Sequence, residues 1–380
     1  MEEEEYIDPS PVWDSLDIDL FLKVFAHTAF SPFFVMLIPT FYLFQGAKMT
    51  DPIVVNSAIY FALVSLFWTV KWCSRLYDNQ ANFLYAPPPL EWNEQIVVIT
   101  GGSSGVGELL ANTLAVKSVT VIVLDVKPVR TDNYNINFYQ CDVSKWEEVD
   151  AVSKKIIEEI GHPTILINNA GVAQGKLILD LTPEDIQQTF NVNTLAHFWT
   201  LKAFLPGMIA KKKGHIVTMA SVMGMHGVAQ LSDYCASKAA LINLHRSLRA
   251  ELNTRYKCPE IRTTLLCPGH IHTPLFATIV PSHKFWFPTL HPIELVKRVI
   301  QALDSTHSQT IYLPFFAHFA PALQVLPGFA SDFASWVSRA DFAMEGFVKL
   351  SGRRDDEGPA PAVELQEQAQ APGNGHLKSS

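Results

Sequence analysis

Candidate strands and helices alternate along the middle of the chain. Short apolar runs with little polar alternation recur there, as expected of strands buried on both faces of a parallel sheet. The candidate strands are residues 96–100, 119–124, 136–140 and 165–167. Helical patterns follow at 108–116 and from 144 to about 160. The alternation from 96 to 313 predicts an α/β fold with a doubly wound parallel sheet.

A glycine-rich turn joins the first candidate strand to the first helix. Its pattern is T-G-x-x-x-G-x-G, made by Thr100, Gly101, Ser103, Ser104, Gly105, Val106 and Gly107 around Gly102. Glycines permit a tight turn and close approach of the backbone to a phosphate, while the helix N-terminus favours negative charge. The layout predicts a pyrophosphate-binding site, and a flexible Gly/Ser loop is the alternative.

An acidic residue ends the second candidate strand. Asp125 can accept hydrogen bonds from adenosine ribose hydroxyls, which favours NAD because a 2′-phosphate would meet a negative charge. Lys127 and Arg130 follow and could bind such a phosphate, so NADP stays open. Only about ten residues separate this strand from the next, too few for a full crossover helix. We therefore expect that helix to be shortened or lost.

Polar and small residues follow the third and fourth candidate strands. Asp142 and Val143 close the third, and Ser144 is predicted to cap the next helix, with Glu147 completing a capping box. The fourth strand runs into Asn168, Asn169, Ala170 and Gly171. Such residues at the carboxyl end of a strand fit the ligand crevice of a doubly wound sheet. A turn that ties loops together would have the same composition.

Three polar side chains define a candidate reaction centre. Tyr234 and Lys238 are four residues apart, so on a helix their side chains share one face. A neighbouring ammonium lowers the pKa of a phenol, which would let Tyr234 exchange a proton with an alcohol or carbonyl near neutral pH. Ser221, thirteen residues earlier, supplies a neutral hydroxyl donor. An ordinary surface tyrosine and lysine are the alternative for this pattern taken alone.

These motifs together resemble the short-chain dehydrogenase/reductase family over roughly residues 94–315. The matching positions, in family order, are Thr100-Gly101-x-x-x-Gly105-x-Gly107, Asp142, Asn168-Asn169-Ala170-Gly171, Asn193, Ser221, Tyr234-x-x-x-Lys238, Pro268-Gly269 and Thr273. Two phrases, LAHFWT at 195–200 and AFLP at 203–206, make the chain similar to the membrane-bound retinol and 17-beta-hydroxysteroid dehydrogenase branch. The resemblance implies a Rossmann-like fold with NAD or NADP as cofactor.

The resemblance also implies a role for each matching residue. Tyr234 would be the acid/base, and Ser221 would hydrogen-bond the reacting oxygen. Lys238 would bind the nicotinamide ribose while lowering the tyrosine pKa, and Asn193 would hold a water that connects Lys238 to solvent. The implied cofactor contacts are Asp142 at the adenine, the Asn168 strand end near the adenosine ribose, and Pro268, Gly269 and Thr273 at the nicotinamide carboxamide.

The N-terminal region is apolar and nearly free of charge. Residues 24–44 carry no formal charge apart from the titratable His27, and residues 53–70 carry none. Each is near the ~20 residues that cross a hydrocarbon core, and the short loop between them predicts a membrane hairpin. Pro32 and Pro39 interrupt the first stretch, which is compatible with a kink or a shallow insertion. A pair of buried core helices is the alternative.

Charges around the hairpin predict its orientation. Lys23, Lys71 and Arg75 lie outside the hairpin and Lys48 lies in its loop, so the positive-inside rule favours a cytosolic catalytic domain. An endoplasmic reticulum or lipid-droplet location is consistent with that orientation. The predicted domains are an acidic segment (1–20), membrane segments (21–75), a linker (76–93), the catalytic domain (94–315), an apolar extension (316–350) and a disordered tail (351–380).

Two further apolar regions follow the catalytic motifs. Residues 274–288 are rich in aromatics and lie where the family carries its substrate lid, which implies a lipophilic substrate. Packing against the domain's own core is the alternative. A helical stripe is then formed by Phe329, Phe333, Trp336, Val337, Ala340, Met344, Phe347 and Val348. That stripe could lie on a membrane, mediate a dimer or cap the fold.

Composition narrows the function classes. Charged residues are 17% of the chain, and the net charge of −8 offers no basic patch for nucleic acid. The histidines and the five cysteines lack zinc-binding spacing, so no metal site is predicted. His270 and His272 flank the Pro268-Gly269 loop and could touch a substrate, but solvated loop histidines are the simpler interpretation.

The predicted function is hydride transfer between NAD(P) and a lipophilic alcohol or carbonyl, of the retinoid, steroid or long-chain lipid class, by a membrane-anchored enzyme. The cofactor carries the hydride, so the protein must place a carbon and handle one proton. The family resemblance also suggests a homodimer formed through two long helices. A non-catalytic nucleotide-binding scaffold and a lipid-surface structural protein are the alternatives.

Overall fold

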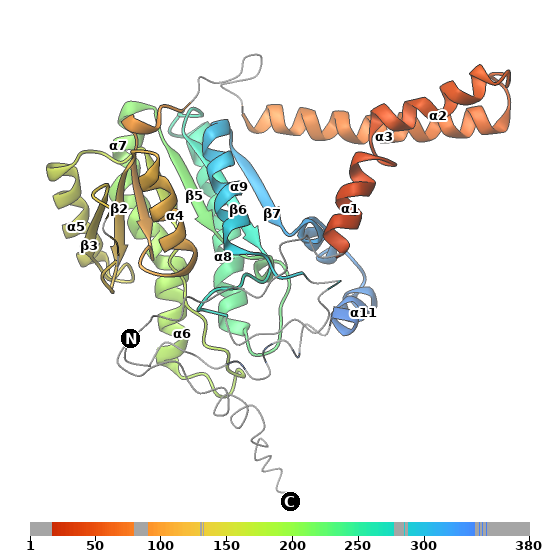
Figure 1. Ribbon diagram of the computed structural model, residues 1–380. Coiled ribbons are helices and arrows are strands. Elements are labelled where there is room, and N and C mark those ends of the chain that lie inside the picture. The colour runs from red at the N-terminus through yellow and green to blue at the C-terminus, as the bar shows by residue number, and fades with distance from the viewer. Residues whose placement is uncertain are drawn as a thin grey trace, which may run out of the picture.

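Seven parallel strands form one sheet at the centre of the protein (Figure 1). The computed structural model describes residues 17–79, 90–129, 131, 133–276, 285, 288–338, 342, 344 and 347. The strands are β1 (Ile96–Thr100), β2 (Thr120–Asp125), β3 (Ile136–Gln140), β4 (Ile165–Asn168), β5 (His215–Met219), β6 (Arg262–Pro268) and β7 (Gln309–Leu313). Their order, β3-β2-β1-β4-β5-β6-β7, reverses direction between β1 and β4, which confirms the doubly wound sheet.

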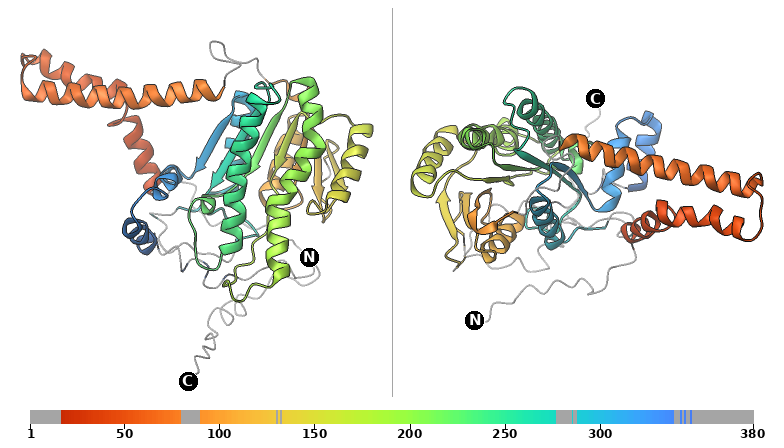
Figure 2. Two further views of the ribbon diagram at one scale, coloured as in Figure 1. Left: turned by 180° about the vertical axis from the view of Figure 1, so that it is seen from behind. Right: turned by 90° about the horizontal axis from the view of Figure 1, so that it is seen from above.

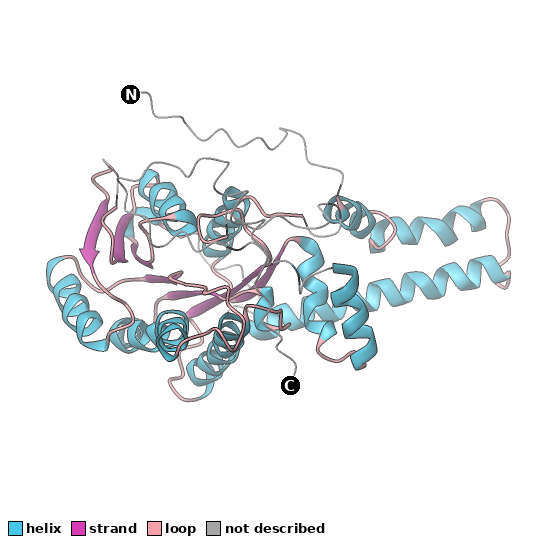
Figure 3. Cartoon of the chain, turned by 90° about the horizontal axis from the view of Figure 1, so that it is seen from below, coloured by secondary structure: helices cyan, strands magenta, loops and turns pink. Residues whose placement is uncertain are grey.

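Helices cover both faces of this sheet (Figure 3). They are α4 (Gly105–Val116), α5 (Trp146–Glu159), α6 (Pro183–Phe190), the π-helical turn η3 (Asn191–Leu195), α7 (Ala196–Lys211), α8 (Ser232–Thr254) and α9 (Pro292–Ser305), with short turns η2 (Trp92–Glu94) and η4 (Val222–Gly224). Successive strand residues point to opposite faces. Val97 therefore joins the core under α4 and α9, whereas Val98 joins the core under α5, α7 and α8.

The connection from β2 to β3 contains no helix among its described residues. This confirms that the second crossover helix is lost. The polypeptide instead turns through Thr131 and Asn133, whose side chains accept hydrogen bonds from backbone amides two residues further on. Arg130, which was expected near a 2′-phosphate, lies outside the described residues.

The predicted capping box at Ser144 is wrong. Helix α5 begins at Trp146, and Lys145 occupies the N-cap position without a side-chain cap. Ser144 instead donates its hydroxyl to Asp142 Oδ1 at 2.6 Å, and its amide donates to the same oxygen at 3.0 Å. The nearby carboxylate of Asp142 competes for the hydroxyl and keeps it in the preceding turn.

The N-terminal hairpin projects away from the catalytic domain (Figure 2). It consists of α2 (Pro32–Phe44) and α3 (Pro52–Asp78), preceded by α1 (Ile18–His27). Residues Pro52–Tyr77 are long and apolar enough to cross a membrane, with a mean hydropathy of 1.9 and 11% of that window buried. Helices α1 and α2 meet this test only as a pair.

The first apolar stretch, 24–44, is not one continuous helix. Helices α1 and α2 are bent by 54° at the break between them. The break precedes Pro32, which starts α2, whereas Pro39 lies inside α2 without ending it. Two carbonyls freed at the break accept hydrogen bonds from α3: Tyr60 binds Ala29 at 2.7 Å and Trp68 binds Phe30 at 2.8 Å. These two backbone carbonyls at the break are therefore hydrogen-bonded by side chains of α3.

The C-terminal extension packs beside the carboxyl end of β7. Its elements are η5 (Phe315–Phe319), α10 (Ala320–Leu323) and α11 (Gly328–Ser338). Of the predicted apolar stripe, Phe329, Phe333 and Trp336 are exposed on α11, whereas Met344 is buried. Residues 80–89 of the linker, Ala340, Val348 and the tail from 348 lie outside the described residues.

Candidate active site

One cavity of about 1230 Å³ lies at the carboxyl ends of the strands. Most of the predicted site residues line it: Gly101, Ser104, Gly105, Val106, Asp125, Asp142, Val143, Asn169, Ala170, Gly171, Ser221, Tyr234, Lys238, Pro268, Gly269 and Thr273. Loops from β1, β2, β4, β5 and β6 therefore bring to one place residues that are far apart in the sequence. This position is the crevice expected for a ligand of a doubly wound sheet.

The glycine-rich turn is built around close backbone contacts. A Cβ added at Gly107 would lie 2.1 Å from the carbonyl oxygen of Gly101, and one added at Gly101 would lie 2.8 Å from Ala170 Cα. Gly101 also has a φ of +65°, which side-chain-bearing residues rarely adopt. These glycines therefore allow α4 to begin directly against the end of β1.

The start of α4 fits an anion. Ser104 is the N-cap residue but its side chain makes no cap hydrogen bond, and Gly105 and Val106 line the cavity. Amides in the first turn of a helix have no partner within the helix, and the helix dipole favours a negative group there. The residues present therefore fit the pyrophosphate of a dinucleotide, and α4 is the element that would hold it.

Thr100 and Asn169 hold the turn against β4. Thr100 Oγ1 accepts hydrogen bonds from the amides of Asn169 and Ala170 at 3.0 and 3.1 Å. The Asn169 side chain donates to the carbonyls of Thr100 and Gly101 at 3.2 and 3.0 Å. Asn168 points elsewhere, because its Oδ1 accepts a hydrogen bond from Thr200 on α7 at 2.8 Å. Asn169, and not Asn168, is thus the amide that borders the cavity.

Asp125 and Asp142 line the cavity where β2 and β3 end. Asp125 accepts backbone hydrogen bonds from Ser103 at 3.0 Å and Lys127 at 3.1 Å, so its carboxylate is fixed at the end of β2. The pKa of Asp142 is lowered, because hydrogen bonds from Ser144 and Lys145 outweigh the opposing effect of burial. Both groups therefore present acceptors to the cavity.

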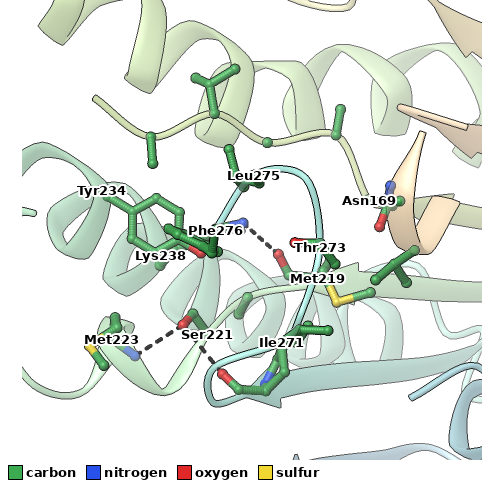
Figure 4. A pocket seen from close by; sticks show the side chains of 18 of the residues that line it. Asn169, Met219, Ser221, Met223, Tyr234, Lys238, Ile271, Thr273, Leu275 and Phe276 are labelled. Carbon is green, nitrogen blue, oxygen red and sulfur yellow. Dashed lines mark hydrogen bonds between the residues drawn. The ribbon is translucent and has the colours of Figure 1, made fainter. Parts of the chain in front are cut away.

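Tyr234, Lys238 and Ser221 line the same cavity and lie close together (Figure 4). Tyr234 and Lys238 lie on one face of α8, and the Lys238 ammonium is 5.6 Å from the centroid of the Tyr234 ring. Ser221 follows β5, and its hydroxyl donates to the Pro268 carbonyl at 3.3 Å and accepts from the Met223 amide at 3.2 Å. The turn η4 after Ser221 packs against α8. Gly224 makes this approach possible, because a Cβ there would lie 2.8 Å from the backbone of Lys238. All three side chains are buried.

The pKa of Tyr234 is raised in this structure, which corrects the expectation that it would be lowered. Burial disfavours the phenolate and outweighs the opposing effect of the nearby Ser221 hydroxyl. Lys238 is affected by the same burial, which lowers the pKa of its ammonium to about 8. The ammonium also donates to the Met219 carbonyl at 2.8 Å instead of to the phenol. Sequence spacing placed the pair correctly, but it carried no information about desolvation.

Asn193 lies behind the cavity, in the π-helical turn η3. Its Oδ1 accepts from the Val172 amide at 2.8 Å, and its amide donates to the Val172 carbonyl and to Ser237 Oγ, each at 3.0 Å. Ser237 donates in turn to the carbonyl of Tyr234 at 2.7 Å. Asn193 therefore ties the loop after β4 to the first turn of α8.

Several residues that form the walls of the cavity could not be predicted from motifs. Phe276 packs edge-on against Tyr234, and Met344 and Phe347 of the C-terminal extension join the same cluster. Helix α1 contributes Ile18 and Leu22 to the lining. His270 also lines the cavity, which places it where it could touch a substrate. Its ring centroid lies 6.5 Å from that of Phe276. The predicted lid residues 277–284, 286 and 287 lie outside the described residues.

Comparisons with known proteins agree with this geometry. A family model described as short chain dehydrogenase matches residues 95–284. The solved structure of 4-hydroxyisoleucine dehydrogenase complexed with NADH superposes with a TM-score of 0.52 at 26% identity, and covers 58% of this chain and 96% of that one. The fold and the site thus define an oxidoreductase that depends on NAD(H) or NADP(H).

Two curated relatives indicate the branch. Mus musculus epidermal retinol dehydrogenase 2 is 36% identical over 244 residues, or 61% of this chain and 78% of the relative. Mus musculus 17-beta-hydroxysteroid dehydrogenase 13 is 34% identical over 246 residues, or 62% and 79%. The chain belongs to the short-chain dehydrogenase/reductase family, in the branch of the retinol and 17-beta-hydroxysteroid dehydrogenases, and it acts on alcohol groups.

Proposed function

We propose that this protein transfers a hydride between NAD(P) and the hydroxyl-bearing carbon of a lipophilic alcohol, or the corresponding carbonyl, at a membrane surface. The observation that carries the proposal is the continuity of the cavity. The polar centre at Tyr234 opens directly onto apolar walls formed by Met223, Phe276, Met344 and Phe347. Binding energy in such a chamber comes from burying apolar substrate surface beside a few fixed polar groups.

Tyr234 is the proposed acid/base. When bound, the nicotinamide supplies the hydride acceptor for alcohol oxidation and the hydride donor for carbonyl reduction. During oxidation the phenolate oxygen of Tyr234 accepts the hydroxyl proton as the C–H bond breaks. Ser221, which lines the same cavity, would hold the substrate oxygen within reach of the phenol. Reduction of a carbonyl runs the same proton transfer in reverse.

Lys238 and Asn193 support the acid/base in this proposal. Lys238 has a pKa of about 8, so near neutral pH it holds a proton that it can lose with little cost. It would bind the nicotinamide ribose and favour the phenolate once the cleft is filled. Asn193 fixes the register between the loop after β4 and α8 through Val172 and Ser237. A water held between Asn193 and Lys238 would complete a proton path to solvent.

NAD is the proposed cofactor. The carboxylate of Asp125 lines the nucleotide end of the cavity and is fixed by two backbone amides. A 2′-phosphate on the adenosine ribose would bring a second negative charge to that carboxylate. Lys127 lines the same end, so its ammonium is the group that would offset this repulsion if NADP were bound.

The hairpin of α2 and α3 is the proposed membrane anchor. Its large apolar side chains are exposed along both helices, including Phe33, Phe41, Leu63 and Leu66. The charge asymmetry around it supports a catalytic domain on the cytosolic side of the endoplasmic reticulum or on lipid droplets.

Recovery of the full chain in carbonate-washed membranes tests whether the hairpin is a membrane anchor. Leu63→Glu with Leu66→Glu should release it, because each charge near a bilayer centre costs about 3 kcal/mol. Val116→Glu, on the exposed end of α4, is the matched control.

A homodimer is proposed through α7 and α8. These helices frame an apolar groove that includes Phe198, Leu201, Leu205, Leu244 and Leu248. Phe198 is exposed at its rim, so a partner there would remove apolar surface from water. The mass of the detergent-solubilised chain, measured by light scattering, distinguishes one copy from two.

A substrate panel tests the proposed activity. Retinol, testosterone and dodecanol would each be incubated with the full chain and with NAD or NADP, and reduced cofactor would be measured. We expect turnover of at least one of these lipophilic alcohols with NAD. Tyr234→Phe should lower kcat by about 10²- to 10⁴-fold. Tyr134→Phe, at a fully exposed position, should not change it. Turnover that survives in Tyr234→Phe would overturn the assigned role of the phenol.

A further inference from the structure

A buried carboxylate ties the N-terminal helix α1 to the catalytic domain. Asp19 is 5% exposed, and its two oxygens accept hydrogen bonds from the consecutive backbone amides of Phe315 and Phe316, the latter at 3.0 Å. These amides begin η5, so the carboxylate meets the donors at the start of a helical turn. The backbone of α1 is held at a second point, because the Ile18 amide donates to the Phe285 carbonyl at 2.9 Å.

The turn that Asp19 binds is in contact with the reaction centre. The Gly269 amide donates to the Leu313 carbonyl at 2.6 Å, which joins the loop after β6 to the residues just before η5. A Cβ added at Gly269 would lie 3.7 Å from the Phe316 ring. The neighbouring Pro268 carbonyl accepts a hydrogen bond from Ser221 Oγ at 3.3 Å. Only one turn and one loop therefore separate Asp19 from Ser221, and the hydrogen bond that supports this loop, from Gly269 to Leu313, does not involve Asp19.

Helix α1 is also a wall of the cavity. Ile18 and Leu22 line it from α1, and Phe316 and Phe319 line it from η5. Asp19 lies between the two α1 residues in sequence and holds the helix against η5. The other end of α1 leads into the hairpin, so one helix connects the apolar anchor with the substrate chamber (Figures 1 and 2).

We propose that Asp19 is a positioning residue that holds α1 over the cavity, and that Ile18 and Leu22 on α1 determine which alcohols bind. This rests on the proposed function. Bulky lipophilic substrates need the α1 wall, because they reach beyond the polar centre and bury surface against it. A small alcohol, confined to the space beside Tyr234 and Ser221, does not touch α1. The anchor helix thereby acts as a specificity element of the active site.

This arrangement predicts a split between two substrates. Asp19→Ala removes the acceptor from the two amides that begin η5, so α1 should leave η5 and the wall should be lost. For the bulky alcohol from the panel that the wild type oxidises best, KM should rise about tenfold or more, since each lost apolar contact weakens binding. For cyclohexanol, kcat/KM should stay within about twofold of the wild type. Asp19→Asn keeps one acceptor oxygen, so its KM for the bulky alcohol should lie between those of the wild type and Asp19→Ala.

A second variant tests the wall without releasing the helix. Leu22→Trp leaves Asp19 in place and adds bulk to the cavity side of α1. It should therefore raise KM for the bulky alcohol and leave kcat/KM for cyclohexanol unchanged. Asp51→Ala is the matched control, because Asp51 also accepts a backbone hydrogen bond, from the Lys48 amide at 2.7 Å, but lies in the hairpin loop. Asp51→Ala should leave KM and kcat/KM unchanged for both alcohols.

The outcomes distinguish failure of the inference about α1 from failure of the proposed function. The inference is wrong if Asp19→Ala and Leu22→Trp change both alcohols by the same factor, or leave both unchanged. Retained cyclohexanol turnover in every variant would show that the reaction centre is intact, so the proposed function would stand in that case. If the wild type oxidises no alcohol with either cofactor, the proposed function fails, and it does so before any variant is compared.

Discussion

The ring of Phe276 lies edge-on to the ring of Tyr234, with centroids 5.8 Å apart and planes at 88°. Phe276 also lies near Phe347, with centroids 6.3 Å apart, so residues from the loop after β6 and from the C-terminal extension enclose the phenol. This enclosure is one source of the burial that raises the pKa of Tyr234. The same aromatic side chains form the apolar wall next to the proposed acid/base.

Phe276→Ala should therefore weaken binding of a bulky lipophilic alcohol. Removing the ring enlarges the chamber beside Tyr234 and deletes its edge-on contact, and we expect KM to rise about tenfold. Steady-state kinetics with the preferred alcohol measure this. Tyr134→Ala removes an aromatic that is fully exposed and should leave KM unchanged. A fall in kcat with no change in KM would contradict the substrate-wall role and would indicate that Phe276 acts on the phenol instead.

Burial of Lys238 predicts a stability that rises with pH. Its pKa is about 8 when folded, against an ordinary value of 10.5, so between these values the unfolded chain binds more protons than the folded one. Stability then increases as pH rises from about 8 to about 10.5, and the destabilisation of about 3 kcal/mol that is present below pH 8 is relieved. Lys238→Met should abolish this rise.

Denaturant unfolding of the cofactor-free chain at several pH values measures the effect. Other groups titrate over the same interval, so only the difference between Lys238→Met and the wild type reports on Lys238. We expect the variant to be the more stable of the two at pH 7 and the difference to shrink towards pH 10. A difference that stays constant across this interval would show that Lys238 keeps its proton when buried.

The sequence predicted the sheet and the local motifs well, because their signals lie within a few residues. Gly101 and Gly107 follow one strand directly, and Tyr234 and Lys238 are one helical turn apart. Both patterns reflect constraints that operate inside a single turn or helix. The lost helix before β3 could be predicted for the same reason, since the number of residues available there limits what can form.

Other features depended on contacts that no local pattern encodes. Asp19 meets Phe315 across 296 residues, and Met344 reaches the cluster around Tyr234 from the C-terminal extension. The capping box at Ser144 failed for a local reason instead, because the Ser144 hydroxyl donates to the carboxylate of Asp142 two residues earlier and α5 begins only at Trp146. The pKa of Tyr234 was predicted in the wrong direction, because sequence spacing reports the proximity of a charge and not the loss of water around it.

Asp125 should determine the preference between the two cofactors. Asp125→Ser removes the negative charge but keeps an oxygen that can accept a hydrogen bond from Ser103. We expect the ratio of kcat/KM for NADP to that for NAD to rise about tenfold or more, because a 2′-phosphate would no longer be repelled while Lys127 remains.

The control for Asp125 is a carboxylate away from the cleft. Asp150 lies on α5 and pairs with Lys154 at 2.6 Å on the surface, so Asp150→Ser should leave the cofactor ratio unchanged. If both variants shift the ratio equally, net charge of the domain is responsible and Asp125 has no specific role. If neither variant shifts it, the ribose end of the cofactor lies away from β2.

Gly107 should be essential for cofactor binding, although it does not itself line the cavity. A methyl group there would lie 2.1 Å from the Gly101 carbonyl oxygen and 2.6 Å from Asn169 Nδ2, so Gly107→Ala must push α4 away from the turn. Its first-turn amides would then leave the position that fits a pyrophosphate, and we expect the Kd for NADH to rise at least about tenfold. Gly227→Ala is the matched control, because nothing lies within 4 Å of the added carbon. Fluorescence titration with NADH compares the two, and equal affinities would mean that α4 does not hold the phosphates.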